Sequence, residues 1–364
     1  MSAWFNSAFS RLVTICRVSE GFINRKIGLK NKKFFARMTD QKKSSVTIGT
    51  HNGSFHCDEV FACYMLKLLP KYKNAEIIRT RDPAVIDKMD IVVDVGGTFD
   101  PQKNRFDHHQ RTFTDTMNSL NPKKKWTIRL SSAGLVYYHF GKEIVARILE
   151  LPESDPITDI IYDKVYENFV QEIDAIDNGV NQHDEEPRVA YLNQKWNETD
   201  KDEQALFYQA MEMVGAEFMD RVLYYKQSWL PARDLVETAI KNRHQADPSG
   251  EIVVLESCGC PWRDHLFNIE EELKLDVPIK YILYQDNNKK WRVQCVPIRI
   301  GSFENRLSLP EEWRGLRDDA LSQKSGIPGC VFVHASGFIG GNDTYEGALK
   351  MAQISLQQQA KNGV

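Results

Sequence analysis

The feature that most constrains this chain is Asp107-His108-His109, a carboxylate followed by two adjacent imidazoles. Burying these polar groups costs free energy unless each has a partner, and together they suit metal ions or phosphate groups. Two upstream segments carry side chains of the same types. One contains His51, His56 and Asp58, and the other contains Asp94. We therefore expect a fold that brings the three segments together.

Short apolar runs predict that these side chains lie on loops at the ends of strands. Residues 46–50 predict a strand, and the apolar spacing after Asp58 predicts a helix. Residues 91–95 predict a buried strand that carries Asp94 to its end, and Gly96-Gly97 follows where the backbone must turn. Ligands of open α/β sheets bind at the carboxyl ends of strands. Asp94 alone would suit a turn cap, but beside the other two clusters we interpret it as a bridging metal ligand.

The rest of the pattern predicts a change of domain. Apolar periodicity predicts a strand at 75–80, a short helix at 83–88 and longer helices beginning near Ser132 and Ile157. After residue 250 the pattern changes to short strands, which predict a smaller α/β domain. The predicted parts are a basic segment at 1–43, a metal-binding domain at 44–199, a helical linker at 200–248 and a substrate-binding domain at 249–364.

Positive charge is concentrated at the N-terminus. Residues 1–43 carry ten Lys/Arg against two acids, whereas the whole chain has a net charge of -3. The remaining body is acidic, which argues against a protein that coats nucleic acid nonspecifically. The basic and aromatic N-terminus is typical of a mitochondrial transit peptide, so we expect a mitochondrial matrix protein, and its lysine-rich patches suit a nuclear or nucleolar pool. A disordered basic tail is the alternative.

Length and composition are those of an ordinary globular protein with two domains, at 364 residues, 42% hydrophobic and 27% charged. No apolar run approaches the roughly 18 residues of a membrane span, so we expect no membrane partner. Seven cysteines without a framework spacing favour reduced thiols in an intracellular compartment.

The clusters predict divalent cations. Their carboxylates supply hard oxygens and their histidines supply imidazole nitrogens, a mixed set that suits Mn²⁺ or Mg²⁺ better than a thiolate-rich zinc site. Downstream, Asp174 and Asp177 are three residues apart and share a helix face. Either would supply the last carboxylate of a second metal site. Two exposed acids are the alternative.

Three further stretches are candidates for substrate binding. Lys124, Lys125 and Trp126 place cations beside an aromatic ring, which suits a single-stranded polynucleotide, although most charge runs are only solvated surface. Arg306, near a glycine and a tryptophan, suits phosphate binding and base stacking. The glycine-rich stretch at 332–341 predicts a turn whose backbone amides suit an anion. Its candidate residues are His334, Ser336, Gly340 and Gly341.

Four ordered motifs resemble those of the DHH phosphoesterase superfamily. They are the spacing of His51, His56 and Asp58, then Val93-Asp94, then Asp107-His108-His109, and last the aspartates of residues 173–179. More narrowly, residues 50–53, 55–59, 93–97 and 166–170 resemble the melanocyte-proliferating-gene (Myg) exonuclease family, and this resemblance extends over nearly all of 46–364. It implies a DHH-type, mostly parallel sheet flanked by helices, a helical linker and a smaller C-terminal α/β domain.

The resemblance also implies roles for the motif residues. His109 would bind the scissile phosphate, Asp107 would orient a histidine, and Asp94 would bridge two cations. The implied ligands are His51, His56 and Asp94 for the first cation, and Asp58, Asp94, His108 and either Asp174 or Asp177 for the second. Two cations about 3.5–4 Å apart activate a water between them for in-line attack, so no side-chain nucleophile is needed.

One departure from the superfamily pattern concerns the first motif. The superfamily usually places aspartates four and six residues after the histidine, whereas Phe55 and His56 follow His51 at four and five and Asp58 at seven. Replacing an aspartate by His56 removes one negative charge from the expected ligand set.

We hypothesise a two-metal hydrolase that removes nucleotides from the 3′ end of single-stranded RNA during RNA processing. A pyrophosphatase or small-nucleotide phosphatase with the same metal core is one alternative. A noncatalytic RNA-binding regulatory protein is another, although it predicts loss of ligand residues. The sequence leaves the oligomeric state open.

Overall fold

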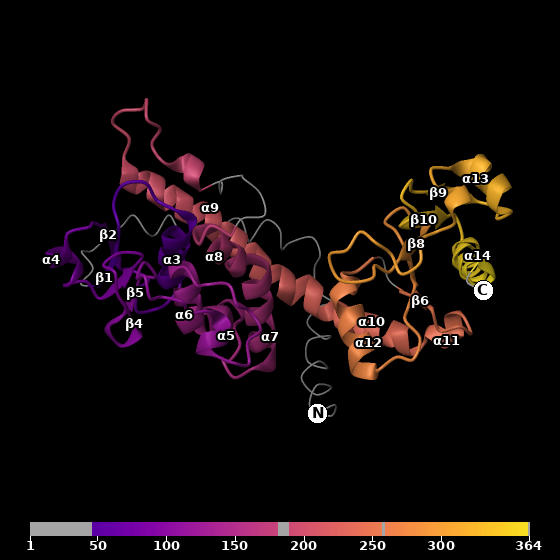
Figure 1. Ribbon diagram of the computed structural model, residues 1–364, viewed down its shortest axis with the longest axis horizontal. Helices are drawn as coiled ribbons and strands as arrows, with labels where there is room; N and C mark the ends of the chain where they lie inside the picture. The colour runs from indigo at the N-terminus through magenta and orange to yellow at the C-terminus, as the bar shows by residue number, and fades with distance from the viewer. Residues whose placement is uncertain (1–45, 181–188, 257–258, 363–364) are drawn as a thin grey trace. The chain divides into compact units, whose positions relative to one another are not determined.

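The computed structural model describes residues 46–180, 189–256 and 259–362 (Figure 1). The chain divides into two compact units, the first ending at Phe218 and the second beginning at Met219. Both units combine a β-sheet with helices, so the predicted α/β class is confirmed. The predicted targeting segment, residues 1–43, lies outside the described residues. Among the helices of the described ranges, none combines the length and apolarity that crossing a membrane requires.

The first unit is built on a mostly parallel sheet, as predicted. Its strands are β1 (Thr47–Thr50), β2 (Glu76–Arg79), β3 (Ile91–Val93), β4 (Phe99–Asp100) and β5 (Arg105–Phe106). Their order within the described residues is β2-β1-β3-β5-β4. β1 is parallel to β2 and β3, and β3 is parallel to β5, whereas the short β4 is antiparallel to β5. The strands β1, β3 and β5 therefore end at the same edge of the sheet.

Two helices pack on the centre of this sheet. α3 (Cys57–Lys67) packs against β3, α6 (Ser132–Leu149) packs against β5, and the two helices pack against each other. Residues Asp58 to Lys67 of α3 are all buried, as expected for a helix that is apolar almost all round. Two acidic residues in its first turn, Asp58 and Glu59, are also fully buried. Carboxylates in such a position need charged or hydrogen-bonding partners.

The predicted long helix after Ile157 has three parts. They are α7 (Pro156–Val165), the π-helical turn η2 (Tyr166–Val170) and α8 (Gln171–Asp177). Asp155 caps the start of α7 by accepting a hydrogen bond from the Ile157 N–H. A single π turn shifts the side-chain register and is frequent near functional sites. The other elements that begin in this unit are α4 (Pro83–Ile86), η1 (Pro101–Lys103), α5 (Met117–Leu120), η3 (Ala190–Leu192) and α9 (Glu203–Tyr224), which continues past Phe218.

The second unit has a mixed sheet with helices on both faces. Its strands are β6 (Ile252–Val254), β7 (Tyr281–Gln285), β8 (Trp291–Cys295), β9 (Cys330–Val333) and β10 (Ile339–Asn342). Their order in the described part of the unit is β6-β7-β8-β10-β9, with β6 and β7 parallel and the other pairs antiparallel. The helical elements are η4 (Tyr225–Trp229), α10 (Leu230–Lys241), α11 (Arg243–Ala246), α12 (Trp262–Leu273), η5 (Glu311–Trp313), α13 (Asp318–Ser325) and α14 (Tyr345–Asn362).

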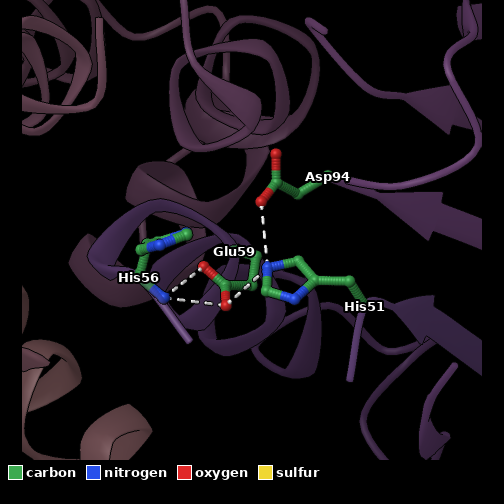
Figure 2. A group of neighbouring side chains, drawn as sticks. All are labelled: His51, His56, Glu59 and Asp94. Carbon is green, nitrogen blue, oxygen red and sulfur yellow. Dashed lines mark hydrogen bonds and ion pairs between the residues drawn. The ribbon is translucent and has the colours of Figure 1, made fainter. Parts of the chain in front are cut away.

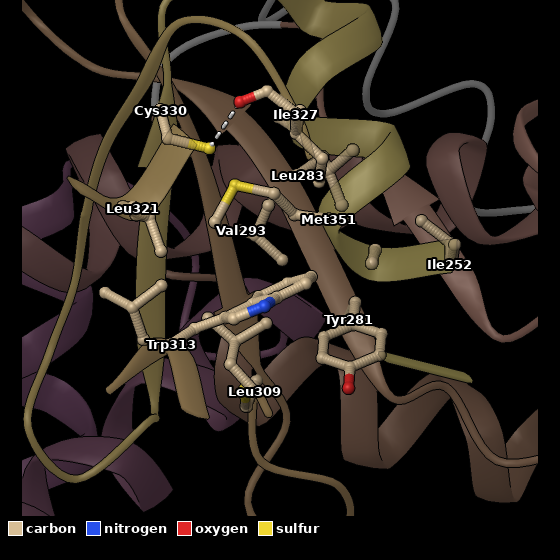
Figure 3. Packing of buried hydrophobic residues seen from close by; sticks show 14 residues of the cluster. Ile252, Tyr281, Leu283, Val293, Leu309, Trp313, Leu321, Ile327, Cys330 and Met351 are labelled. Atoms are coloured by element: carbon tan, nitrogen blue, oxygen red, sulfur yellow. Dashed lines mark hydrogen bonds between the residues drawn. The ribbon is translucent and has the colours of Figure 1, made fainter. Parts of the chain in front are cut away.

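Strand alternation divides the core of this unit into two layers. Ile252 and Leu283 pack around Trp313 with side chains of α13 and α14 (Figure 3). The neighbouring residues Val253 and Ile282 point to the opposite face and pack against α10 and α12. Successive side chains of a strand point to opposite faces, so both faces of the sheet are apolar and both are covered.

The glycines predicted to form an anion-binding turn lie instead in a strand. Gly340 and Gly341 belong to β10, which pairs with β8 on one side and β9 on the other. A Cβ at Gly340 would lie 2.9 Å from Cδ1 of Leu309, and one at Gly341 would meet the side chain of Arg292. Close packing inside the sheet, rather than a turn, therefore explains both glycines.

Candidate metal centre

The ends of three parallel strands bring the candidate ligands together, as predicted. His51 follows β1, Asp94 follows β3, and Asp107-His108 follows β5. Asp94 has a φ of 57°, in the left-handed region that aspartate and asparagine tolerate better than most residues. The chain turns sharply here, and the Asp94 carboxylate lies near the rings of His51, His108 and His109.

The first cluster consists of four side chains, shown in Figure 2: His51, His56, Glu59 and Asp94. One potential ligand atom of each lies within 4.8 Å of the others. Nε2 of His51 lies 3.1 Å from Oε1 of Glu59 and 3.4 Å from Oδ2 of Asp94. His51 is buried and His56 is exposed, so this cluster is accessible from solvent at His56.

Glu59 is a member of this cluster that the sequence motifs did not indicate. Its two carboxylate oxygens lie 2.9 and 3.0 Å from the backbone N of His56, which donates to them in a capping box at the start of α3. A glutamate three residues after an N-cap and just before an apolar run was the available signal. Glu59 therefore fixes the start of α3 and contributes a carboxylate beside His51.

The second cluster consists of Asp58, His108 and Asp177. Nε2 of His108 lies 2.8 Å from Oδ2 of Asp177, and its Nδ1 lies 3.5 Å from Oδ1 of Asp94. The hydroxyl of Ser132 donates to Oδ1 of Asp94 at 3.2 Å, and its N–H donates to Oδ2 of Asp58 at 3.2 Å. One oxygen of Asp94 thus faces each cluster.

Two observations fit divalent cations at these clusters. Oδ1 of Asp58 is buried and has no hydrogen-bond partner among the described residues. Burial, together with the nearby carboxylates of Asp94 and Asp177, raises the pKa of Asp58 well above its ordinary value. Burial alone would lower the pKa of His51, but hydrogen bonds to Asp94 and Glu59 raise it to about 10. Both shifts reflect an excess of buried negative charge, and the oxygen and imidazole donors suit Mn²⁺ or Mg²⁺.

Asp107 and His109 form a pair beside the clusters. Oδ1 of Asp107 lies 2.7 Å from Nδ1 of His109, and Oδ2 accepts the N–H of Gly97 at 2.6 Å. Burial alone would raise the pKa of Asp107, but the hydrogen bonds from His109 and Gly97 hold it below its ordinary value. The same contact with Asp107 raises the pKa of His109. The His109 side chain is 59% exposed, so its ring is accessible to an anionic ligand.

Asp174 and Asp177 occupy different environments. Oδ1 of Asp174 accepts hydrogen bonds from the N–H and hydroxyl of Ser131 at 2.9 and 2.8 Å, and Oδ2 accepts one from the Tyr166 hydroxyl at 3.0 Å. Burial raises the pKa of Asp174 to about 7 despite these bonds. A Cβ on Gly134 would collide with this carboxylate, at 2.3 Å from Oδ1. Asp177, and not Asp174, therefore lies with the candidate ligand atoms.

The basic loop that follows Asp107-His108-His109 makes its contacts with other residues of the first unit. Trp126 is buried and its ring centroid lies 5.0 Å from that of Tyr166, so this ring is not presented to a nucleobase. Nζ of Lys124 forms an ion pair with Asp163, and Nζ of Lys125 lies 2.5 Å from Glu167. These contacts correct the prediction that Trp126 provides a stacking surface.

The candidate substrate residues of the second unit are likewise partnered. Arg306 makes two hydrogen bonds of 2.7 Å to Glu270 and one of 2.9 Å to the carbonyl of Ile279, so its guanidinium is occupied within the unit. His334 and Ser336 lie in an exposed turn between β9 and β10, with Nδ1 of His334 2.9 Å from the Ser336 hydroxyl. Their role in substrate binding remains a prediction.

Comparison with known proteins identifies relatives over most of the chain. The MYG1_exonuc family model, described as an uncharacterised protein family (UPF0160), matches residues 47–356. The MYG1 exonuclease of Rattus norvegicus is 57% identical over 322 residues, which cover 85% of this chain and 84% of that protein. The MYG1 exonuclease of Homo sapiens is 55% identical over 86% of each chain. The MYG1 protein of Saccharomyces cerevisiae is 43% identical over 88% of this chain and 98% of its own length.

Solved structures match at much lower similarity. An exopolyphosphatase-related protein from Bacteroides fragilis is 12% identical, with 94% of this chain and 98% of that chain covered and a TM-score of 0.20. A DHH domain described as a member of the s1p family of ribosomal proteins is 12% identical, with coverages of 93% and 97% and a TM-score of 0.25. At such TM-scores these two structures add nothing to the description of this fold.

Proposed function

Because the chain belongs to the MYG1 exonuclease family, we propose that it is a metal-dependent phosphodiester hydrolase that removes nucleotides from the 3′ end of single-stranded RNA. The observation that carries this proposal is the position of Asp94, whose two oxygens face the two clusters. A carboxylate shared between two cation sites would hold two cations close together, as two-metal hydrolysis requires.

Each cluster supplies the residues for one cation. His51, His56, Glu59 and Asp94 would hold the first, and Asp58, His108, Asp177 and the other oxygen of Asp94 would hold the second. Cations bound in this way activate water and neutralise charge on phosphoryl oxygens. Ser132 donates hydrogen bonds to both Asp58 and Asp94 and so keeps these carboxylates in fixed orientations.

The pair of Asp107 and His109 would hold the scissile phosphate. Asp107 fixes the ring of His109 through Nδ1 and favours its protonated form. An exposed ring fixed in this way next to the cation sites can donate a hydrogen bond to a phosphate oxygen without leaving its place. The side chain of His109 would therefore orient the group that is attacked.

RNA as the substrate, the 3′ end as the starting point and RNA processing as the setting follow from the family resemblance. The names of the rat and human relatives support an exonuclease. We extend the proposal to a mitochondrial matrix location with a nuclear or nucleolar pool. It rests on the composition of residues 1–43, ten Lys/Arg against two acids, and is tested by imaging the tagged full chain with and without that segment.

The test of the activity uses the full chain with Mn²⁺ or Mg²⁺ and single-stranded RNA labelled at its 5′ end. Stepwise shortening of the labelled strand is expected, and Asp94→Asn should abolish it. Asp318→Asn is a matched control, because Asp318 also has a positive φ, of 47°, but is exposed and lies in the second unit. Release of phosphate from pyrophosphate in a parallel reaction, with intact RNA, would contradict the nuclease and favour a small-substrate enzyme. Binding of RNA without turnover of either substrate would favour a noncatalytic RNA-binding protein.

A further inference from the structure

Residues 189–202, which we name the aromatic segment, carry two large exposed rings. Trp196 is 97% exposed and Tyr191 is 69% exposed. Figure 1 shows this segment as the loop that projects beyond the N-terminal end of α9. An exposed tryptophan leaves a large apolar surface in contact with water, and burying that surface against a ligand is favourable. Trp196 is therefore a candidate ligand contact.

The aromatic segment is fastened to the loop that carries the metal ligands. The side-chain oxygen of Asn193 accepts the N–H of Phe55 at 2.8 Å, and its amide nitrogen donates to the Phe55 carbonyl at 2.8 Å. Phe55 directly precedes His56. Trp196 follows Asn193 by three residues, a stretch of chain that spans at most about 10 Å.

A second connection fastens the far end of the segment. Arg79 donates to the carbonyl of His51 at 3.2 Å and to that of Gly53, and it also donates to the carbonyl of Glu203 at 3.4 Å. Its guanidinium lies 4.9 Å from the ring centroid of Phe207 on α9. Both ends of the aromatic segment are therefore held against the metal-ligand loop, and Tyr191 and Trp196 lie within two and three residues of the anchoring Asn193.

We propose that Tyr191 and Trp196 stack on nucleobases of the substrate strand and guide it toward the metal clusters. This inference rests on the proposed function, because it names the bases of a single-stranded nucleic acid as the ligand. Exposed aromatic rings beside a cation are the combination that binds single strands, and Lys195, next to Trp196, is exposed and makes no ion pair within the described residues. The buried ring of Trp126 cannot fill this role.

The test measures binding without turnover. The full chain in EDTA is titrated into a fluorescent 12-residue oligoadenylate, and into an abasic ribose-phosphate strand of the same length. Trp196→Ala is expected to weaken binding of the oligoadenylate on the order of five- to 100-fold and to change binding of the abasic strand little. Trp196→Phe should retain most of the affinity, and Tyr191→Ala should show a smaller loss of the same kind.

Tyr224→Ala is the matched control, because Tyr224 is a 44% exposed aromatic residue at the end of α9, outside the predicted substrate-binding domain. Equal losses for Trp196→Ala and Tyr224→Ala, or equal losses on the two strands, would overturn the stacking role. Unchanged oligoadenylate binding by Trp196→Ala would overturn it as well, even if the wild-type chain shortens RNA. Base-dependent binding through Trp196 without any hydrolysis would support the stacking role and contradict the nuclease instead.

Discussion

Asn193 and Phe55, 138 residues apart, are joined by two hydrogen bonds of 2.8 Å that use both backbone polar groups of Phe55. The side chain of Asn193 thus makes the two hydrogen bonds that a neighbouring strand would otherwise make with Phe55. The contact fixes the backbone just before His56 and so positions one of the candidate metal ligands.

Asn193→Ala is expected to lower the free energy of unfolding by about 1–2 kcal/mol, because both groups of Phe55 lose their partner. It should also weaken Mn²⁺ binding, measured by calorimetry, because the His56 loop becomes less ordered. Asn197→Ala removes an exposed asparagine from the same segment and should change neither quantity. Wild-type Mn²⁺ affinity in Asn193→Ala would contradict this positioning role.

Asp58→Asn should stabilise the metal-free protein. The Asp58 carboxylate is fully buried near the carboxylates of Asp94 and Asp177, and a neutral amide removes this repulsion while it can still accept the Ser132 N–H. Functional sites often contain residues that lower stability. We therefore expect Asp58→Asn to raise the free energy of unfolding by about 0.5–2 kcal/mol in EDTA. The rise in melting temperature on adding Mn²⁺ should shrink in the same variant. A lower melting temperature than wild type in EDTA would refute the account.

Substitutions of Asp174 and Asp177 should distinguish a structural carboxylate from a metal ligand. Asp174→Ala leaves the Ser131 and Tyr166 donors without their acceptor in the core, so we expect a loss of stability of about 3 kcal/mol. Asp177→Ala should leave metal-free stability closer to wild type and abolish binding of the second Mn²⁺. Thermal unfolding in EDTA and a Mn²⁺ titration distinguish the two. Loss of Mn²⁺ binding in a folded Asp174→Ala protein, with full binding in Asp177→Ala, would reverse the assignment.

Local sequence patterns were sufficient to predict the strand ends. The apolar runs before His51 and Asp94 form β1 and β3, and the ligands lie where those runs end. This succeeded because a buried parallel strand is read from a few consecutive residues. That Asp174 and Asp177 share a helix face did not show which of them is the metal ligand. Asp174 instead accepts a hydrogen bond from Ser131, which lies 43 residues before it in the chain.

Errors arose where a partner distant in sequence determines what a side chain does. Trp126 is covered by Tyr166 and therefore does not present a stacking surface. Arg306 is held by Glu270, 36 residues before it, and its contact with substrate stays a prediction. No local pattern reports such contacts. Gly340 was predicted in an anion-binding turn because a glycine-rich stretch lies between a predicted strand and a predicted helix, but Gly340 lies inside the sheet, where it packs closely against Leu309.

Asp247 provides a test of pH-dependent stability outside the candidate metal centre. Its carboxylate accepts the N–H of Ser249 at 3.0 Å and the side-chain amide of Gln353 on α14 at 2.9 Å. Burial alone would raise the pKa of Asp247, but these hydrogen bonds lower it from its ordinary value of 3.8. The nearby Tyr345 is neutral over the relevant range, since burial raises its pKa above 10.0.

A carboxyl group whose pKa is lower in the folded state stabilises the protein above its unfolded pKa, and this contribution is lost as the pH falls through the folded pKa. Asp247→Asn should therefore lower stability by about 1 kcal/mol at pH 7, and the difference from wild type should shrink below about pH 4. Thermal unfolding of both proteins at pH 7, 5 and 3.5 measures it. Asp276→Asn is the control, because Asp276 is 84% exposed and its nearest cation, on Arg243, lies 3.9 Å away. A difference for Asp247→Asn that stays constant down to pH 3.5 would show that the hydrogen bonds do not depend on the charge of Asp247.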